Sequence, residues 1–278
     1  MPQIKKILFP VDFSSGCLGA ARYVEAFAGQ FEAEILLLHA VAMGEHTLPE
    51  ELLPVREAQL NAFMADELKY FTTQRVVVAG DAASAIAEAA DFFKPDLVMM
   101  ATHGLGFFRR HLLGSVTAKA LHDLPCPIWT SVHAENAPQL EDIHCRRILC
   151  AVDLGDRSRC VVEWAAWLAG EYQASLGIVH ATTPLDAATP GWTLGEELAQ
   201  HVAEQAKKSV YALQAELRTN ARVFVNSGDP ASVIAVAARD FAADLLVIGR
   251  HDQTGAAGFL LHHAYAILRE SPCPVISI

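Results

Sequence analysis

An internal repeat is the feature of this sequence that most limits what the chain can fold into. Five short motifs occur in one order in the first part of the 278 residues and return in the same order in the second part. The run at 7–12 (Ile-Leu-Phe-Pro-Val-Asp) returns at 148–153 (Ile-Leu-Cys-Ala-Val-Asp), an offset of 141 (153 − 12). The other pairs are His39-Ala40 with His180-Ala181, Gly80-Asp81 with Gly228-Asp229, Asp96-Leu97 with Asp244-Leu245, and Pro125-Cys126-Pro127 with Pro272-Cys273-Pro274. We therefore expect one small domain written twice.

Each copy alternates between strand-like and helix-like segments. The strand-like segments are continuous apolar runs, as in a parallel sheet that is covered on both faces. In the first copy we expect strands at Lys5–Val11, Glu34–Ala40, Gln74–Ala79, Leu97–Ala101 and Ile128–Val132, and helices at Ser15–Gln30, Pro49–Phe71, Ala83–Phe93 and Ser115–Asp123. The chain is thus predicted to be an α/β protein with two tandem doubly wound five-stranded parallel sheets of strand order 3-2-1-4-5. The polar segment 135–146 is expected to link domains at 1–138 and 139–278.

Composition and charge exclude several classes of function. The net charge is −11 and the basic residues are scattered, so we expect neither nucleic acid nor a membrane as a partner. The start of the chain passes directly into strand-like sequence without the apolar run of a signal peptide, which predicts a cytoplasmic protein. None of the six cysteines forms a CxxC pair, so we expect neither a zinc ribbon nor a thioredoxin-type motif. We expect no disulfide between the neighbouring Cys145 and Cys150 in a reducing compartment. Cys126 and Cys273 are expected to act as small apolar residues.

The candidate site follows from the predicted topology. A parallel sheet of this kind binds ligands beyond the carboxyl ends of its strands, where the strand order reverses between the first and fourth strands. Asp12 ends the first strand, and its carboxylate suits either hydrogen bonding to a ligand's sugar or base or capping the next helix. Ser115 follows Gly114 at the start of a predicted helix, where free N–H groups favour an anion. The alternative for Ser115 is a simple N-cap.

Histidines near the same strand ends have two interpretations. His39 and His180 end equivalent strands, and we expect them to be buried and hydrogen-bonded. His262 and His263, with Asp252 and His251, suggest a metal site, but neighbouring residues on a helix point in different directions. We therefore expect these histidines to lie on the helix surface or to fill the crevice, and we expect no metal.

Together these residues resemble the nucleotide-binding signature of the universal stress protein superfamily. That signature is Gly, two residues, Gly, nine residues, then Gly-Ser or Gly-Thr, and here nine residues separate Gly104 from Gly114-Ser115. The run at 11–14 (Val-Asp-Phe-Ser) and Gly80-Asp81 resemble two further motifs of the family. The resemblance covers nearly the whole chain, twice, and implies an adenine nucleotide alpha hydrolase-like fold. Ala101 departs from the signature because it stands where the first glycine belongs.

The resemblance implies that the first copy binds ATP or AMP, with Mg²⁺ as an open question. The residues implied around adenosine are Pro10, Val11, Asp12 and Val41, the last through its backbone. Those implied around ribose and phosphates are Met100, Ala101, His103, Gly104, Gly114, Ser115, Val116 and Thr117. No P-loop lysine or dedicated magnesium carboxylate pair is present, so any ATP hydrolysis is expected to be slow and no catalytic residue is assigned. The family also implies that the two halves pair through their last strands as an intramolecular pseudo-dimer, while further homodimerisation stays open.

The second copy departs further from the signature. Gly249 keeps the first glycine, but Asp252 stands at the second, and His262-His263 replace Gly-Ser. We expect that this copy does not bind ATP in the family manner. The leading hypothesis is therefore a stress-response or regulatory protein that binds nucleotide in its first domain. The alternatives are a nucleotide-free scaffold acting through protein partners and, ranked last, an enzyme of the related electron-transfer or adenylyl-transferring families.

Overall fold

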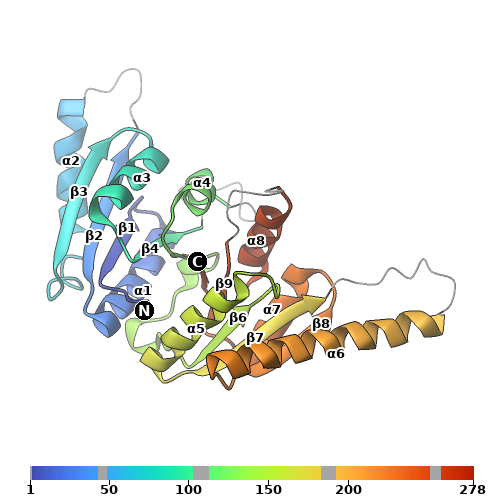
Figure 1. Ribbon diagram of the computed structural model, residues 1–278. Helices are drawn as coiled ribbons and strands as arrows, with labels where there is room; N and C mark the ends of the chain where they lie inside the picture. The colour runs from blue at the N-terminus through green and yellow to red at the C-terminus, as the bar shows by residue number, and fades with distance from the viewer. Residues whose placement is uncertain (1, 43–48, 103–112, 183–191, 251–257) are drawn as a thin grey trace. The chain divides into compact units, whose positions relative to one another are not determined.

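The computed structural model of the chain consists of two compact units, Met1–Ile143 and His144–Ile278, and most of their helices and strands are labelled in Figure 1. It describes all residues except 1, 43–48, 103–112, 183–191 and 251–257. The division lies between Ile143 and His144, so the end of the polar segment expected to link the domains belongs to the second unit. Within the described residues, no helix combines the length and apolar character needed to span a membrane.

The first unit is a five-stranded parallel sheet of strand order β3-β2-β1-β4-β5, as predicted. Its strands are β1 (Lys6–Pro10), β2 (Glu34–Val41), β3 (Thr73–Ala79), β4 (Leu97–Ala101) and β5 (Ile128–Ser131). Its α-helices are α1 (Ser15–Phe31), α2 (Pro49–Ala62), α3 (Ala82–Phe93) and α4 (Ser115–Asp123). The central strands are almost wholly buried, which accounts for their continuous apolar sequences.

The second unit repeats this arrangement, with the strand order β8-β7-β6-β9-β10. Its strands are β6 (Arg147–Ala151), β7 (Ser175–Thr182), β8 (Arg222–Ser227), β9 (Leu245–Ile248) and β10 (Val275–Ser277). Its helices are α5 (Ser158–Tyr172), α6 (Trp192–Leu217), α7 (Pro230–Phe241) and α8 (Gly258–Glu270). Helix α5 packs against α6 and α7 packs against α8. Both units have the same strand order, which confirms the predicted duplication.

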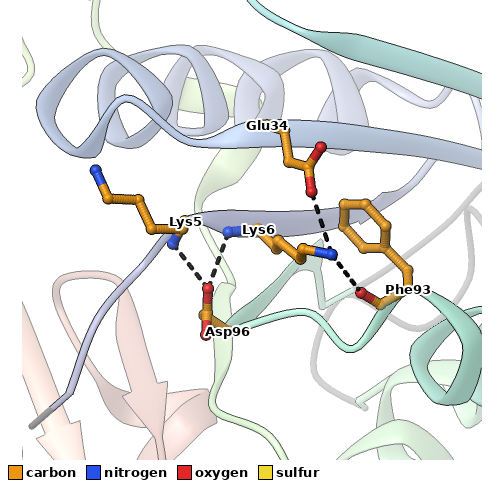
Figure 2. A network of polar contacts seen from close by, with 5 residues as sticks. All are labelled: Lys5, Lys6, Glu34, Phe93 and Asp96. Atoms are coloured by element: carbon orange, nitrogen blue, oxygen red, sulfur yellow. Dashed lines mark hydrogen bonds and ion pairs between the residues drawn. The ribbon is translucent and has the colours of Figure 1, made fainter.

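The repeated Asp-Leu motif has a structural purpose that is the same in both units. One carboxylate oxygen of Asp96 accepts the backbone N–H groups of Lys5 and Lys6, at 2.8 and 3.0 Å (Figure 2). Asp244 accepts those of Arg146 and Arg147, both at 2.8 Å. These bonds fix the start of the central strand in each unit. The first unit adds an ion pair between Lys6 Nζ and Glu34 Oε1, which lie 3.3 Å apart (Figure 2).

The repeated Gly-Asp motif is likewise explained by backbone geometry. Gly80 has φ +140° and Gly228 has φ +152°, conformations that side-chain-bearing residues rarely adopt. The aspartate that follows is the N-cap of the next helix: Asp81 accepts from the N–H of Ser84 at 2.9 Å. The same cap recurs in the second unit at the start of α7.

Helix α2 ends at Ala62 and is shorter than predicted. The predicted helix is too long because the apolar spacing continues through the residues after Ala62, which form turns. Met64 has a left-handed backbone with φ +52°. The guanidinium of Arg75, on β3, donates to the carbonyls of Leu60 and Phe63, at 3.0 and 2.9 Å. These carbonyls lie at the end of the helix, and a residue distant in sequence satisfies them.

The expected linker packs on the first unit rather than hanging between domains. Two short 3₁₀ turns, η1 (Ala134–Asn136) and η2 (Leu140–Asp142), lie against α1. Ala134 is 1% exposed, and the backbone of Gly19 approaches its carbonyl so closely that a Cβ at Gly19 would lie 1.6 Å from that oxygen. The guanidinium of Arg22 donates to Ala137 O at 2.7 Å. All six cysteines are free, as expected, although Cys126 is only partly buried.

Candidate functional site

The predicted site lies where β1 and β4 end side by side. The two strands pair in parallel through Ile7 with Leu97 and Leu8 with Val98. Their carboxyl ends therefore open onto the same edge of the sheet, and the strand order reverses between them. The residues that follow the two strands are Val11 and Asp12 on one side and Thr102 on the other. The topology thus brings together the ends of the two strands that the sequence singled out.

Asp12 is held in place by its neighbour and does not itself cap the helix. Its Oδ1 accepts from the backbone N–H of Ser14 at 3.0 Å and from the hydroxyl of Ser14 at 2.6 Å. Ser14 is the N-cap of α1, because its Oγ accepts from the N–H of Cys17 at 3.1 Å. The capping role considered for Asp12 therefore belongs to Ser14, and the side chain of Asp12 is free for another purpose.

The thiol of Cys17 lies beneath this turn and is chemically quiet. Burial, and to a lesser extent the charge of the nearby Asp12 carboxylate, raise its pKa to about 12 against hydrogen bonds that lower it. A thiol with such a pKa carries almost no thiolate at neutral pH. Cys17 is accordingly a packing residue here, not a nucleophile.

The end of β2 closes the site from the side opposite β4. His39 is 9% exposed, and its Nδ1 lies 2.6 Å from the carbonyl oxygen of Val11, so this nitrogen is the one that donates. In the second unit, His180 Nδ1 lies 2.8 Å from Val152 O. Both histidines are hydrogen-bonded as predicted, but His180 is only half-buried. Val41 is buried, and its carbonyl accepts from Gly80 N at 2.9 Å.

Helix α4 begins without a side-chain cap. Gly114 is its N-cap, with φ −60° and ψ 144°, and no side chain among the described residues caps the helix. Ser115 is exposed and lies one position inside the helix, so the alternative that it is a simple N-cap is wrong. The backbone N–H groups of the first turn point out of the helix end, which favours an anion.

The start of α4 is fixed against the end of β4. The N–H of Gly114 donates to Thr102 O at 2.8 Å, and a Cβ at Gly114 would lie 3.0 Å from that oxygen. The hydroxyl of Thr117, which is buried, donates to Ala101 O at 3.1 Å. The hydroxyl proton of Thr117 is therefore used in a bond within the protein, and we assign this hydroxyl no donor role toward a ligand.

Of the remaining predicted site residues, one is buried, three are partly exposed and two lie outside the described residues. Met100 is buried at the end of β4, and Ala101 and Pro10 are partly exposed at the ends of their strands. Val116 is partly exposed in the first turn of α4. His103 and Gly104 lie outside the described residues.

The family model for the universal stress protein family matches residues 3–131 and 144–278. The chain belongs to the universal stress protein family. Universal stress protein A homolog 1 of Coxiella burnetii is 29% identical over 49% of this chain and 97% of that protein. Universal stress protein MJ0531 of Methanocaldococcus jannaschii is 33% identical over 45% of this chain and 79% of that protein. A solved universal stress protein from Archaeoglobus fulgidus shares the fold, with a TM-score of 0.66 and 20% identity, and the match covers 98% of this chain and 97% of that one.

The second unit of this universal stress protein keeps one part of the arrangement. Asp153 Oδ1 accepts from Gly155 N at 2.8 Å and from the hydroxyl of Ser158 at 2.9 Å. Asp153 is exposed, and the N-cap of α5, Arg157, makes no side-chain capping bond. His251 and Asp252 lie outside the described residues, as do the side chains of His262 and His263. The part of the chain that the structure describes holds no cluster of metal-binding side chains.

Sequence reasoning missed Ser14 and Thr102 at the site of this universal stress protein. The serine two residues after Asp12 is a signal that could have been used, because serine is favoured at an N-cap and can bond a nearby aspartate. Thr102 is 1% exposed and its hydroxyl donates to Ser131 O at 3.0 Å, linking β4 to β5. That contact joins two residues that are distant in the chain, and nothing in the local sequence predicts it.

Proposed function

We propose that the first unit binds an adenine nucleotide, ATP or AMP, at the carboxyl ends of β1 and β4, and that this binding serves a stress-response or regulatory role. The observation that carries the proposal is the pairing of two complementary features at one edge of the sheet. The first is the α4 N-terminus, which has no side-chain cap among the described residues and is fixed to Thr102 through Gly114. The second is the fixed carboxylate of Asp12.

The residue types fit the parts of a nucleotide. Phosphate oxygens accept hydrogen bonds, and the backbone N–H groups of Ser115, Val116 and Thr117 supply donors together with the positive end of the helix dipole. The hydroxyl of Ser115 is exposed and adds a further donor. Asp12 accepts from a hydroxyl or amino group of the nucleoside. Pro10, Val11 and Val41 provide apolar and backbone surface for adenosine, and Met100, Ala101, His103 and Gly104 complete the proposed set.

Ala101 sets an expectation about affinity. It replaces the first glycine of the family signature, and its side chain brings one methyl group to the end of β4. The proposal is that this methyl group weakens nucleotide binding without abolishing it. No residue is assigned to catalysis, so ATP hydrolysis is proposed to be slow at most, with Mg²⁺ tested as an additive in the binding assay.

We propose that the second unit does not bind ATP in the same way. Asp252 would repel a polyphosphate, and His262-His263 stand in the sequence where the family signature has Gly-Ser. Pairing of the two units through β5 and β10, domain limits at 1–138 and 139–278, and a cytoplasmic location all stay predictions of the sequence.

Titration calorimetry of the full chain with ATP and AMP, with and without Mg²⁺, tests the proposal. Wild type is expected to bind at sub-millimolar nucleotide with one site per chain. Gly114→Asp places a carboxylate at the helix end and is expected to abolish binding, while the matched His262→Asp in the second unit is expected to leave it unchanged. Absence of heat at millimolar nucleotide, or equal losses from the two variants, would refute the proposal.

The second candidate function is a scaffold that works through protein partners without nucleotide. Ala101 favours it, as does the loss of the signature in the second unit. Mass spectrometry of small molecules released from the purified protein separates the two: a bound adenine nucleotide supports the first proposal. A protein free of nucleotide that also fails the titration supports the scaffold.

A further inference from the structure

Ser14 has a role at the site that its position as a helix cap does not require. Its hydroxyl has one proton, and that proton goes to Asp12 Oδ1 across 2.6 Å. The hydroxyl oxygen of Ser14 accepts from Cys17 N at 3.1 Å, so the hydroxyl is fixed by both of its bonds. Ser14 is 6% exposed, which protects both bonds from water. A helix cap needs only the second of these bonds.

The consequence is that Asp12 presents a single oxygen atom. Oδ1 already accepts two bonds, from the N–H and the hydroxyl of Ser14, at 3.0 and 2.6 Å. An sp² carboxylate oxygen has two lone pairs, so Oδ1 is saturated. The N–H and O–H groups of the described residues that bond this carboxylate both end on Oδ1 and leave Oδ2 to the neighbouring Cys17 thiol or a ligand. The carboxylate is therefore oriented with one open acceptor.

The backbone around this carboxylate is held in an unfavourable conformation. Phe13, between Asp12 and Ser14, has φ +61°, a left-handed value that is uncommon for a bulky side chain. Its ring packs against His39 and Phe63, with centroid distances of 4.6 and 5.7 Å. Conformations of this kind persist only when the surroundings hold them, and they gather at functional sites. The packing of Phe13 thus brings Ser14 back onto Asp12.

The second unit provides a natural comparison. Leu154 repeats the left-handed backbone with φ +63°. The hydroxyl that donates to Asp153, however, belongs to Ser158, in the first turn of α5. Asp153 is exposed, whereas Asp12 is partly buried. The two units therefore hold equivalent carboxylates by different serines, and only the first has an α4-type Gly-Ser start beside it.

We propose that Ser14 is a positioning residue for the nucleotide site. It fixes Asp12 so that Oδ2 accepts a hydrogen bond from a hydroxyl or amino group of the nucleoside, while the phosphates bind elsewhere at the start of α4. This inference rests on the proposed binding of adenine nucleotide in the first unit. It deepens that proposal by dividing the site into a nucleoside part under the control of Ser14 and a phosphate part that is independent of it.

The test compares ATP with inorganic tripolyphosphate on the full chain by calorimetry. Ser14→Ala is expected to weaken ATP binding about tenfold, the effect of losing one hydrogen bond to a charged group, and to leave tripolyphosphate binding within twofold. Ser14→Thr keeps the hydroxyl and is expected to restore ATP affinity. Ser158→Ala is the matched control in the second unit and is expected to change neither affinity.

The outcomes distinguish this inference from the proposal beneath it. If Asp12→Ala weakens ATP binding but Ser14→Ala does not, the positioning role is refuted and the nucleotide site stands. If Ser14→Ala weakens ATP and tripolyphosphate equally, Ser14 is a general structural residue and the inference fails. If wild type binds no nucleotide, both proposals fall.

Discussion

Replacing Gly19 with alanine is expected to destabilise the first unit, although alanine is the better helix former. Gly19 lies within α1, and an added Cβ would lie 1.6 Å from the carbonyl oxygen of Ala134 and 2.6 Å from its carbon. Ordinary contacts between such atoms exceed 3 Å, so the η1 segment must move away by more than an ångström. The backbone oxygen cannot rotate aside as the end of a flexible side chain would.

The magnitude follows from what the movement breaks. Arg22 donates to Ala137 O at 2.7 Å and to Pro138 O at 3.2 Å, and Ala134 is buried. Losing one charged hydrogen bond costs about 1.5–3 kcal/mol, and alanine returns about 0.5–1 kcal/mol of helix propensity. We expect a net loss of about 1–2 kcal/mol in the free energy of unfolding of the first unit. The η1 segment is also expected to become more accessible to protease.

Two matched glycines in exposed helix positions act as controls. A Cβ at Gly29, in the same helix, would lie 3.9 Å from Phe71 Cζ, an ordinary contact, and one at Gly170 would meet nothing within 4 Å. Gly29→Ala and Gly170→Ala are therefore expected to stabilise by about 0.5–1 kcal/mol. Urea unfolding followed by circular dichroism, with limited proteolysis of residues 133–143, measures all three variants. If Gly19→Ala stabilises the protein as the controls do, the docking of the linker on α1 is refuted.

Three further predictions follow from the described contacts. Gly177→Ala would place a Cβ 2.9 Å from Leu149 Cδ1 and 3.1 Å from Phe241 Cε1, and thermal unfolding is expected to show a loss of about 1–3 kcal/mol from overpacking. The N–H and hydroxyl of Ser84 lower the pKa of Asp81, so Asp81→Ala should lower the unfolding midpoint at pH 7, and the difference should shrink as the pH falls and the carboxylate is protonated; a difference that does not shrink on acidification contradicts this. Maleimide labelling of the native protein should modify the exposed Cys160 first, because burial raises the pKa to about 12 in the protected thiols of Cys17, Cys145, Cys150 and Cys273; early labelling of any of these four contradicts the structure.

The sequence by itself determined the duplication and the strand order of each unit. The buried strands are continuous apolar runs, and the repeated motifs occupy equivalent turns, so local pattern and topology agree. The Gly80 turn is a local matter, because a positive φ at a glycine is a property of one residue. The same is true of the helix cap at Asp81. Such features can be predicted because the groups that interact are neighbours in the chain.

The tertiary structure alone decided where several elements end and which groups remain available. Helix α2 ends at Ala62, where Arg75 on β3 donates to the carbonyls of Leu60 and Phe63. Thr117 gives its hydroxyl proton to Ala101, and the linker docks because Gly19 leaves room for Ala134. Asp12 was predicted as a site residue, but its freedom from helix capping depends on Ser14 and on the backbone of Phe13. These outcomes rest on contacts between distant residues or on fine backbone geometry, which residue pattern alone does not specify.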